Sequence, residues 1–232
     1  RTVRAVKSGL PSLFALAGVS CVVAFALAMP ASPLAPSAAT FLAAAVPAWL
    51  APLFWLREGY SRSRLLQSAL GPVPAIVFVA LVLRIALGAS VVPGRLVLGA
   101  LTVVAMLAVA HLTATLIEDI LRRLGAGESP AREWSYWTVT AMLWLAAAAP
   151  LWLGPVADLA AGIQPRLPSI VLGSSPLVHL AVACGHDVLR DQWVYAHTSL
   201  GALQVDYPRL PLVLSVYVAA AVALSVLRAA QA

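Results

Sequence analysis

Long apolar runs separated by short charged clusters constrain this chain more than any other feature. Six such runs of roughly 20 residues can be placed, and a run of this length crosses the hydrocarbon core of a bilayer as a helix. Apolar residues make up 62% of the 232-residue chain and charged residues only 10%. The sequence therefore predicts an all-α, polytopic membrane helix bundle that forms a single transmembrane domain over residues 1–232.

Proline, glycine and charged residues mark the ends of the expected spans. Pro30 ends the first span, and a Pro-Arg-Leu-Pro sequence at Pro208–Pro211 leads into the last. Residues 157–209 form the longest stretch without a span, and they are too few for a folded soluble domain. The six spans are expected at about residues 10–29, 38–56, 72–90, 95–117, 134–156 and 210–227.

Lys and Arg are divided unevenly between the two sides of this map. Ten lie on the side of the N-terminus, the second-to-third loop, the fourth-to-fifth loop and the C-terminus, and four lie on the other side. Cytoplasmic segments are enriched in Lys and Arg, so both termini are expected in the cytoplasm and the 157–209 segment outside it. The net charge of +6 then reflects contact with anionic lipid, not binding of nucleic acid.

Composition and the first residue give two further expectations. Lys occurs once, at Lys7, while Arg and Ala are abundant. This usage favours a bacterial source, which places the protein in the cytoplasmic (inner) membrane. The chain begins with Arg1 rather than Met, so we expect further residues before it.

The extracytoplasmic segment contains a stretch, Ser174–Trp193, in which apolar patches alternate with polar residues. On a helix, His179, His186 and Arg190 would fall at i, i+7 and i+11 and would share one face. This pattern predicts an amphipathic helix that either lies on the outer interface or enters the membrane as a re-entrant helix.

The same stretch holds the densest group of titratable residues in the chain. Metal ligands on one helix favour spacings of three or four residues, as in H-E-x-x-H, whereas His179 and His186 are seven apart. A polar face packed against a loop or partner is therefore favoured over a metal or proton-relay site. The possible outer-face polar cluster comprises His179, His186, Asp187 and Arg190, with Asp191 and His197 nearby in sequence.

A second charged group follows the fourth span. Glu118 and Asp119 are each followed four residues later by an arginine, Arg122 and Arg123. Residues four apart are neighbours on a helix, so both acids can pair along one face. The pattern is typical of a solvated, self-compensated helix end, and a contact surface for a cytoplasmic partner is the alternative.

Isolated polar residues inside the spans provide no catalytic constellation. Arg84 lies near the outer end of the third span, from which its side chain can reach the headgroups. His111 is the single histidine within a strong span, and one histidine is too few for haem ligation between helices. Cys21 and Cys184 are expected at different depths, so no disulfide is predicted. The chain lacks the G-x-S-x-G, P-loop and G-x-G-x-x-G motifs, and neither catalysis nor a cofactor is expected.

Three stretches carry a resemblance to the membrane subunit of ABC-2-type exporters. Leu56–Pro74, with its acidic and basic residues, a glycine and a Leu-Leu pair before prolines, is similar to the coupling-helix segment of that family. Ser174–Leu180 is similar to the Ser/Asn-Pro-Leu start of its external re-entrant helix. The proline-rich approach Pro165–Pro168 fits the same place.

The resemblance implies an oligomeric permease with six spans that works with a separate nucleotide-binding ATPase in the cytoplasm. That partner would hydrolyse ATP and push on the coupling helix, rocking the spans between two accesses. The contact residues implied by the resemblance are Arg57, Glu58, Arg62 and Arg64.

Two other classes of protein fit the same pattern. The sparse polar interior and the single intramembrane histidine also suit a non-catalytic structural or assembly subunit of a larger respiratory or photosynthetic complex. An intramembrane enzyme that uses the His179–His197 cluster is the third possibility. Co-purifying proteins separate the first two classes, and loss of activity in His186→Ala without loss of the fold would indicate the third.

Overall fold

The computed structural model describes residues 2–28, 34–55, 69–152, 167–188 and 207–230, with the backbone alone for residues 2–14, 54–55, 151–152 and 167. These residues are helical apart from short connections, and no strand occurs among them. The prediction of an all-α fold is therefore confirmed for this part of the chain.

The long helices lie where the spans were expected. The ends of each helix lie within a few residues of the predicted range, except that α1 starts earlier, α5 ends later, and α6 both starts earlier and ends earlier, at Ala147 instead of residue 156, with the short α7 after it. The long helices are α1 (Thr2–Ala28), α2 (Pro36–Trp55), α4 (Pro72–Leu87), α5 (Pro93–Arg123), α6 (Glu128–Ala147) and α12 (Leu210–Ala229). The short ones are α7 (Ala149–Trp152), α9 (Leu167–Ser174) and α10 (Pro176–Cys184).

Three described helices are long and apolar enough to cross a membrane, which marks the chain as a membrane protein. They are Pro36–Leu53 in α2, Pro93–Arg123 in α5 and Leu210–Ala229 in α12. The apolar stretches Ala15–Ala28 and Pro72–Leu87 are helical but shorter.

Proline and glycine set several of the helix ends. Proline occupies the first or second position of α4, α5, α10 and α12, where its missing N–H costs no helical hydrogen bond. Gly88 and Gly185 follow α4 and α10 with φ angles of 62° and 69°. These left-handed conformations end the two helices because glycine adopts them without a steric penalty.

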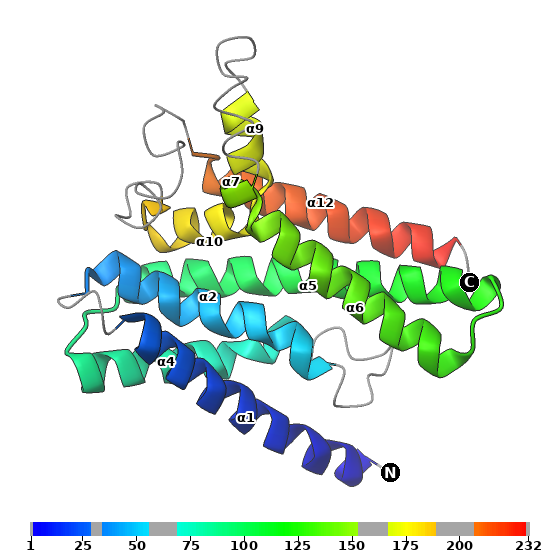
Figure 1. Ribbon diagram of the computed structural model, residues 1–232, viewed down its shortest axis with the longest axis horizontal. Coiled ribbons are helices and arrows are strands. Elements are labelled where there is room, and N and C mark those ends of the chain that lie inside the picture. Colours follow the sequence, from blue (N-terminus) through cyan, green and yellow to red (C-terminus); the bar gives the residue numbers. More distant parts are fainter. Residues whose placement is uncertain (1, 29–33, 56–68, 153–166, 189–206, 231–232) are drawn as a thin grey trace.

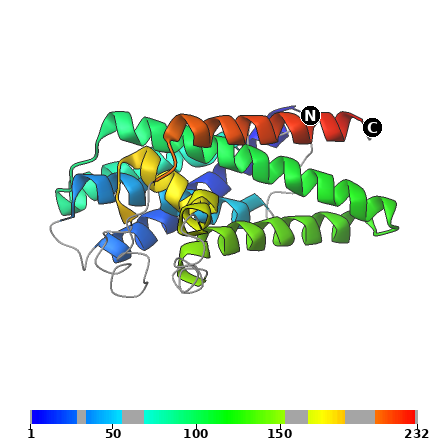
Figure 2. The same ribbon diagram turned by 90° about the horizontal axis from the view of Figure 1, so that it is seen from above.

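Helix α5 runs through the middle of the molecule, and α2, α6, α10 and α12 all pack against it. Helix α1 packs against α2 and α4, on the side of the bundle away from α10 and α12 (Figure 1). Helix α12 lies beside α5 at one edge of the bundle (Figure 2). Both chain ends lie toward the end of the bundle that carries the α5–α6 turn (Figure 1).

Small residues let the helices approach closely in two apolar cores. One core surrounds α5 and includes Ala44, Leu107 and Leu180. The other joins α1, α2 and α4 and includes Ala24 and Val79. Close packing of small side chains is typical of helix interfaces in membranes, where lipid offers no hydrophobic advantage to association.

Candidate functional site at the α6–α10 break

The end of α6 lies against the start of α10 inside the bundle, and this meeting point is here named the α6–α10 break. Along the chain, α7, residues 153–166 and α9 separate the two helices. The Ser175 hydroxyl, directly before α10, donates a hydrogen bond to the carbonyl oxygen of Ala147, the last residue of α6, at 3.1 Å. Both residues are fully buried. The last carbonyls of a helix have no partner within that helix, so Ser175 supplies a hydrogen bond that the Ala147 carbonyl would otherwise lack.

The lengths of the helices indicate how the break is used. Helix α5 has 31 residues and is therefore about 46 Å long, whereas α6 and α10, with 20 and 9 residues, measure about 30 and 14 Å. Both pack on α5, α6 toward the α5–α6 turn and α10 toward the opposite end (Figure 1). Two helix segments thus cover a length of α5 that one continuous helix would otherwise cover.

Helix α10 is enclosed by its neighbours, although it has only nine residues. It packs against α2, α5, α6 and α12. Its buried side chains are Val178, Leu180, Ala181, Ala183 and Cys184. The helix therefore lies within the bundle and not along its surface.

Gly99 on α5 permits this placement. A Cβ atom at Gly99 would lie 2.8 Å from the Cys184 sulfur and 3.2 Å from the Ala44 Cβ. Such distances are too short for ordinary contact, so the absence of a side chain brings α2, α5 and α10 together at one point.

His179 connects α10 to two other elements. One ring nitrogen lies 2.8 Å from the Tyr217 hydroxyl on α12, and the other lies 2.8 Å from the carbonyl oxygen of Gly173 in α9. A ring nitrogen facing a carbonyl must carry the proton, so Nε2 donates to Gly173 and Nδ1 accepts from Tyr217 when the ring is neutral. His179 therefore orients α10 relative to α9 and α12.

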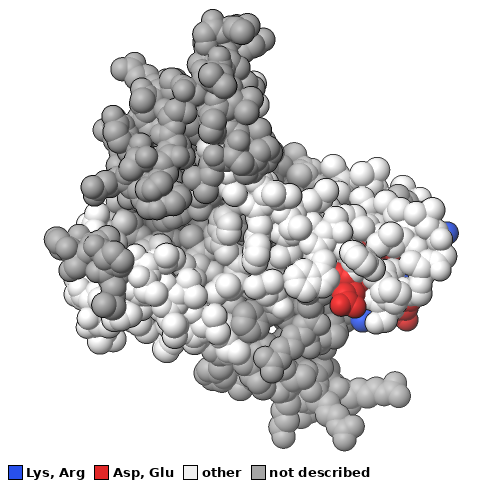
Figure 3. Space-filling model, in the orientation of Figure 1, with Lys and Arg blue, Asp and Glu red and all other residues white. Residues whose placement is uncertain are grey.

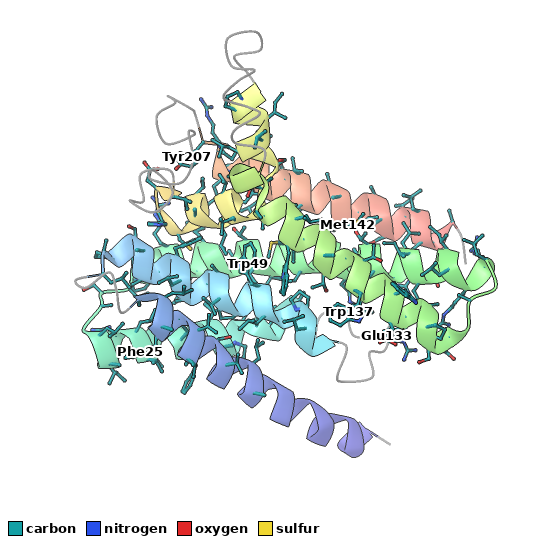
Figure 4. All side chains as sticks on the ribbon, in the orientation of Figure 1. Phe25, Trp49, Glu133, Trp137, Met142 and Tyr207 are labelled. Carbon is teal, nitrogen blue, oxygen red and sulfur yellow. The ribbon has the colours of Figure 1, made fainter. Side chains whose placement is uncertain are left out.

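The predicted shared face of His179 and His186 is wrong, because α10 ends at Cys184 and Gly185 turns the chain. His186 instead stacks on Phe41 of α2, with ring centroids 5.1 Å apart. Asp187 accepts a hydrogen bond from the Tyr207 hydroxyl, and Tyr207 lies on the α10 side of the molecule (Figure 4). The expected outer-face cluster is thus divided, with His186 and Asp187 past the end of α10 and His179 turned toward α12.

Several residues singled out from the sequence lie outside the described residues. These are the expected contact residues Arg57, Glu58, Arg62 and Arg64, and also Arg190, Asp191 and His197. Among the residues that are described, no three His, Cys, Asp or Glu side chains come together as metal ligands would.

Charges gather at the end of the bundle where α5 meets α6, and Figure 3 shows acidic and basic atoms there. Glu118 is 1% exposed, and its carboxylate pairs with Arg122 one turn later and with Arg132 of α6 at 3.7 Å. Glu128 bridges the same two arginines at 3.0 and 3.3 Å. The predicted Glu118–Arg122 pair is confirmed. The expectation of a solvated helix end is wrong for Glu118, because α6 packs over it.

The neighbouring acid joins a third helix to this end. The Asp119 carboxylate lies 3.9 Å from the Arg228 guanidinium in the last turn of α12. Helices α5, α6 and α12 are therefore linked by charge at a single end of the molecule.

The two isolated polar residues of the expected spans, Arg84 and His111, differ in their exposure. Arg84 is exposed in the last turn of α4, from which its side chain can extend toward the helix end. His111 is fully buried on α5. The nearby Thr113 and Thr115 hydroxyls donate to carbonyls of their own helix, and the described cysteines form no disulfide.

Sequence reasoning missed the aromatic partners of the histidines. Phe41 and Tyr217 lie 145 and 38 residues away from the histidines that they contact, and no local pattern relates them. The end of α10 did have a signal, since a glycine after an apolar helical run is typical of a helix C-terminus.

In comparisons with known proteins, no family model, no curated protein and no solved structure matches this chain.

Proposed function

We propose that this chain is a permease-like subunit of an ABC-2-type export system in the bacterial cytoplasmic membrane. The observation that carries the proposal is the α6–α10 break, with Ser175 bonded to Ala147 and α10 packed against four helices. Helix ends that meet within the membrane are a recurring feature of transporters, and the backbone polar groups at such ends must be satisfied by the protein because lipid cannot do so. In this proposal α10 is the re-entrant helix expected from Ser174–Leu180.

We further propose that six segments cross the membrane, namely α1, α2, α4, α5, α6 with α10 completing its path, and α12. The charged α5–α6 turn, the N-terminus and the C-terminus would then face the cytoplasm, in agreement with the distribution of Lys and Arg. The segment between α2 and α4, which holds Arg57–Arg64, would lie on the same side.

The proposed mechanism assigns ATP hydrolysis to a separate cytoplasmic subunit. Its closure would push on Arg57, Glu58, Arg62 and Arg64. Helices α5 and α6 would respond as one body, because the Glu118, Glu128, Arg122 and Arg132 side chains join them. The relative motion would then fall at the α6–α10 break and along α12.

Co-purification with a charge-reversed variant tests this proposal. The variant Arg57→Glu/Arg62→Glu/Arg64→Glu should lose a stoichiometric ATPase partner, while Arg209→Glu at the opposite end of α12 should keep it. The readouts are mass spectrometry of the purified complex and its ATPase rate. Retained association and retained ATPase stimulation in the triple variant would contradict the proposal.

A second candidate function, a structural subunit of a larger membrane complex, is favoured by an exposed aromatic face on α6. Trp134, Trp137, Met142 and Trp144 are all exposed, and Figure 4 shows Trp137 and Met142 on this helix. Ten residues separate the outermost tryptophans, about 15 Å along the axis, so they cannot all lie at one headgroup level. Tryptophan and methionine are enriched at protein interfaces, and stoichiometric cofactor-bearing partners without an ATPase would support this alternative.

A further inference from the structure

An apolar pocket lies beside the helix break and has no role in the proposed mechanism. Its volume is about 340 Å³, and it is lined by α1, α2, the end of α6 and the start of α10. Phe41 lies toward one end of the pocket along α2, and Leu50 lies nine residues further along the helix, about 14 Å away. Leu27, which is 57% exposed, marks the side from which the pocket is reached.

The size and lining of the pocket restrict its occupant. Pockets for small molecules range from roughly 300 to 1,000 Å³, so this one suits a single narrow ligand. Its lining side chains are aliphatic and aromatic, and a cavity of this kind does not hold water well. A lone hydrocarbon chain meets both conditions.

Cationic and polar groups lie next to the Phe41 end of the pocket. Phe41 stacks on His186. The residue before His186, Gly185, lies against the end of the Arg95 side chain, since a Cβ at that position would be 3.2 Å from Arg95 Nε and 3.4 Å from Cζ. The Thr40 hydroxyl also accepts a hydrogen bond from the Val92 backbone at 3.1 Å. This bond holds the first turns of α2 and α5 together. The contacts of Phe41 with His186 and of Gly185 with Arg95 lead from the pocket lining to the exposed Arg95, although no lining residue comes from α5 itself.

We infer that this pocket binds the chain of a single-chain anionic amphiphile, with its headgroup at Arg95 and His186. The apolar lining suits the hydrocarbon chain of the ligand. The Arg95 guanidinium favours a negatively charged headgroup, since arginine binds phosphate and carboxylate oxygens through paired N–H groups. If the chain is a permease, this ligand class is its substrate, and that last step rests on the proposed function.

A larger apolar groove of about 690 Å³ between α5 and α12 serves as an internal comparison. Neither place has a charged lining residue, but Arg228, next to Ala229 at one end of the groove, is already paired with the Asp119 carboxylate at 3.9 Å. Ordinary lipid contact would occupy both places, whereas a headgroup-specific site would be confined to the pocket near Arg95.

Photo-labelling in phosphatidylcholine nanodiscs tests the inference. The probe is dodecyl phosphate with a diazirine near the end of its chain, and labelled peptides are identified by mass spectrometry. Labelling should concentrate on the 41–50 part of α2 and on the start of α10. Excess dodecyl phosphate should compete, whereas dodecyltrimethylammonium and inorganic phosphate should not.

Two pairs of matched variants separate the chain from the headgroup. Leu27→Trp should fill the pocket mouth, and each methylene excluded weakens binding roughly fourfold, so labelling should fall by about tenfold or more. Leu81→Trp on α4, also at an exposed leucine, should leave labelling unchanged. Arg95→Gln should remove the preference for phosphate over trimethylammonium, whereas Arg95→Lys and Arg209→Gln should retain it.

The outcomes decide the inference independently of the transport proposal. Equal labelling of the α5–α12 groove, or labelling unchanged by Leu27→Trp, would overturn the site. Equal competition by the two charged amphiphiles would overturn the anionic headgroup. Specific labelling without an ATPase partner would leave the binding site intact and would refute the proposed export function alone.

Discussion

Helices α10 and α12 are consecutive among the described helices, yet the bundle holds them in opposite ways. Helix α10 has nine residues, of which five are buried. Helix α12 has 20 residues, and Val213 is its single buried one. Helix α12 packs mainly on α5, with a smaller contact to α10, whereas α10 is enclosed by four long helices.

The difference shows that apolar composition does not report burial in a membrane bundle. Both helices are rich in Val, Leu and Ala. A bilayer can cover an apolar helix as well as protein can, so the sequence of α12 carries no requirement for neighbours. Helix α10 is too short to cross a bilayer, and it is held to its neighbours by the hydrogen bonds of Ser175 and His179 and by the packing at Gly99.

A leucine-to-alanine substitution should lower the free energy of unfolding far more on α10 than on α12. Leu180→Ala on α10, where the side chain is 1% exposed, should lower the free energy of unfolding by about 2–5 kcal/mol because it opens a cavity. Leu212→Ala on α12, where exposure is 59%, should change it by less than about 0.5 kcal/mol. Denaturant unfolding in mixed micelles measures both, and equal losses would contradict the contrast.

Filling the Gly99 contact should have the next largest effect. Gly99→Ala places a Cβ against the Cys184 sulfur and should cost about 1–3 kcal/mol. The control is Gly18→Ala in α1, where nothing lies within 4 Å, and this change should be neutral or stabilising by up to about 1 kcal/mol. Adding Cys184→Ala to Gly99→Ala should restore much of the loss, and an absence of rescue would mean that the contact is misassigned.

The hydrogen bond between the two helices should contribute a smaller amount. A double-mutant cycle with His179→Phe and Tyr217→Phe should give a coupling energy of about 0.6–1.7 kcal/mol, which is the range for hydrogen bonds between membrane helices. The cycle removes the effect of the bond to Gly173, which is lost in both backgrounds that carry His179→Phe. A coupling energy near zero would show that this hydrogen bond does not hold α12 to α10.

A bulky residue on the outward face of α12 should have the smallest effect on stability. Val216 is exposed and does not line the α5–α12 groove. Val216→Trp should change the free energy of unfolding by less than about 0.5 kcal/mol. If a partner subunit covers this face, the variant should instead lose that partner during purification while its unfolding curve stays the same.

The sequence predicted the helices well, because apolar runs and prolines are local signals. The starts at Pro72 and Leu210 were predicted to the residue. Helix α5 extends past its apolar run to Arg123 because Arg122 neutralises Glu118 along the same helix. Helix α6 starts at Glu128 rather than near Trp134, since its first turn carries the charges that face α5.

The site could be predicted only in part, because its contacts join residues far apart in the chain. The start of α10 after Ser175 was expected from the resemblance. The pairing of Ser175 with Ala147, and of Gly99 with Cys184, depends on which helices become neighbours. Helical periodicity gives the apolar face of one helix but does not identify the helix that will cover it.

The placement of Glu118 also has a consequence for how the chain is made. A lone carboxylate is costly to move into the membrane during synthesis, and Arg132 of α6 emerges from the ribosome only after α5 is complete. Arg122 lies one turn from Glu118 on the same helix and pairs with it directly. Helix α5 therefore carries its own counter-ion for Glu118, and the formation of this helix end need not wait for the helix that later buries the charge.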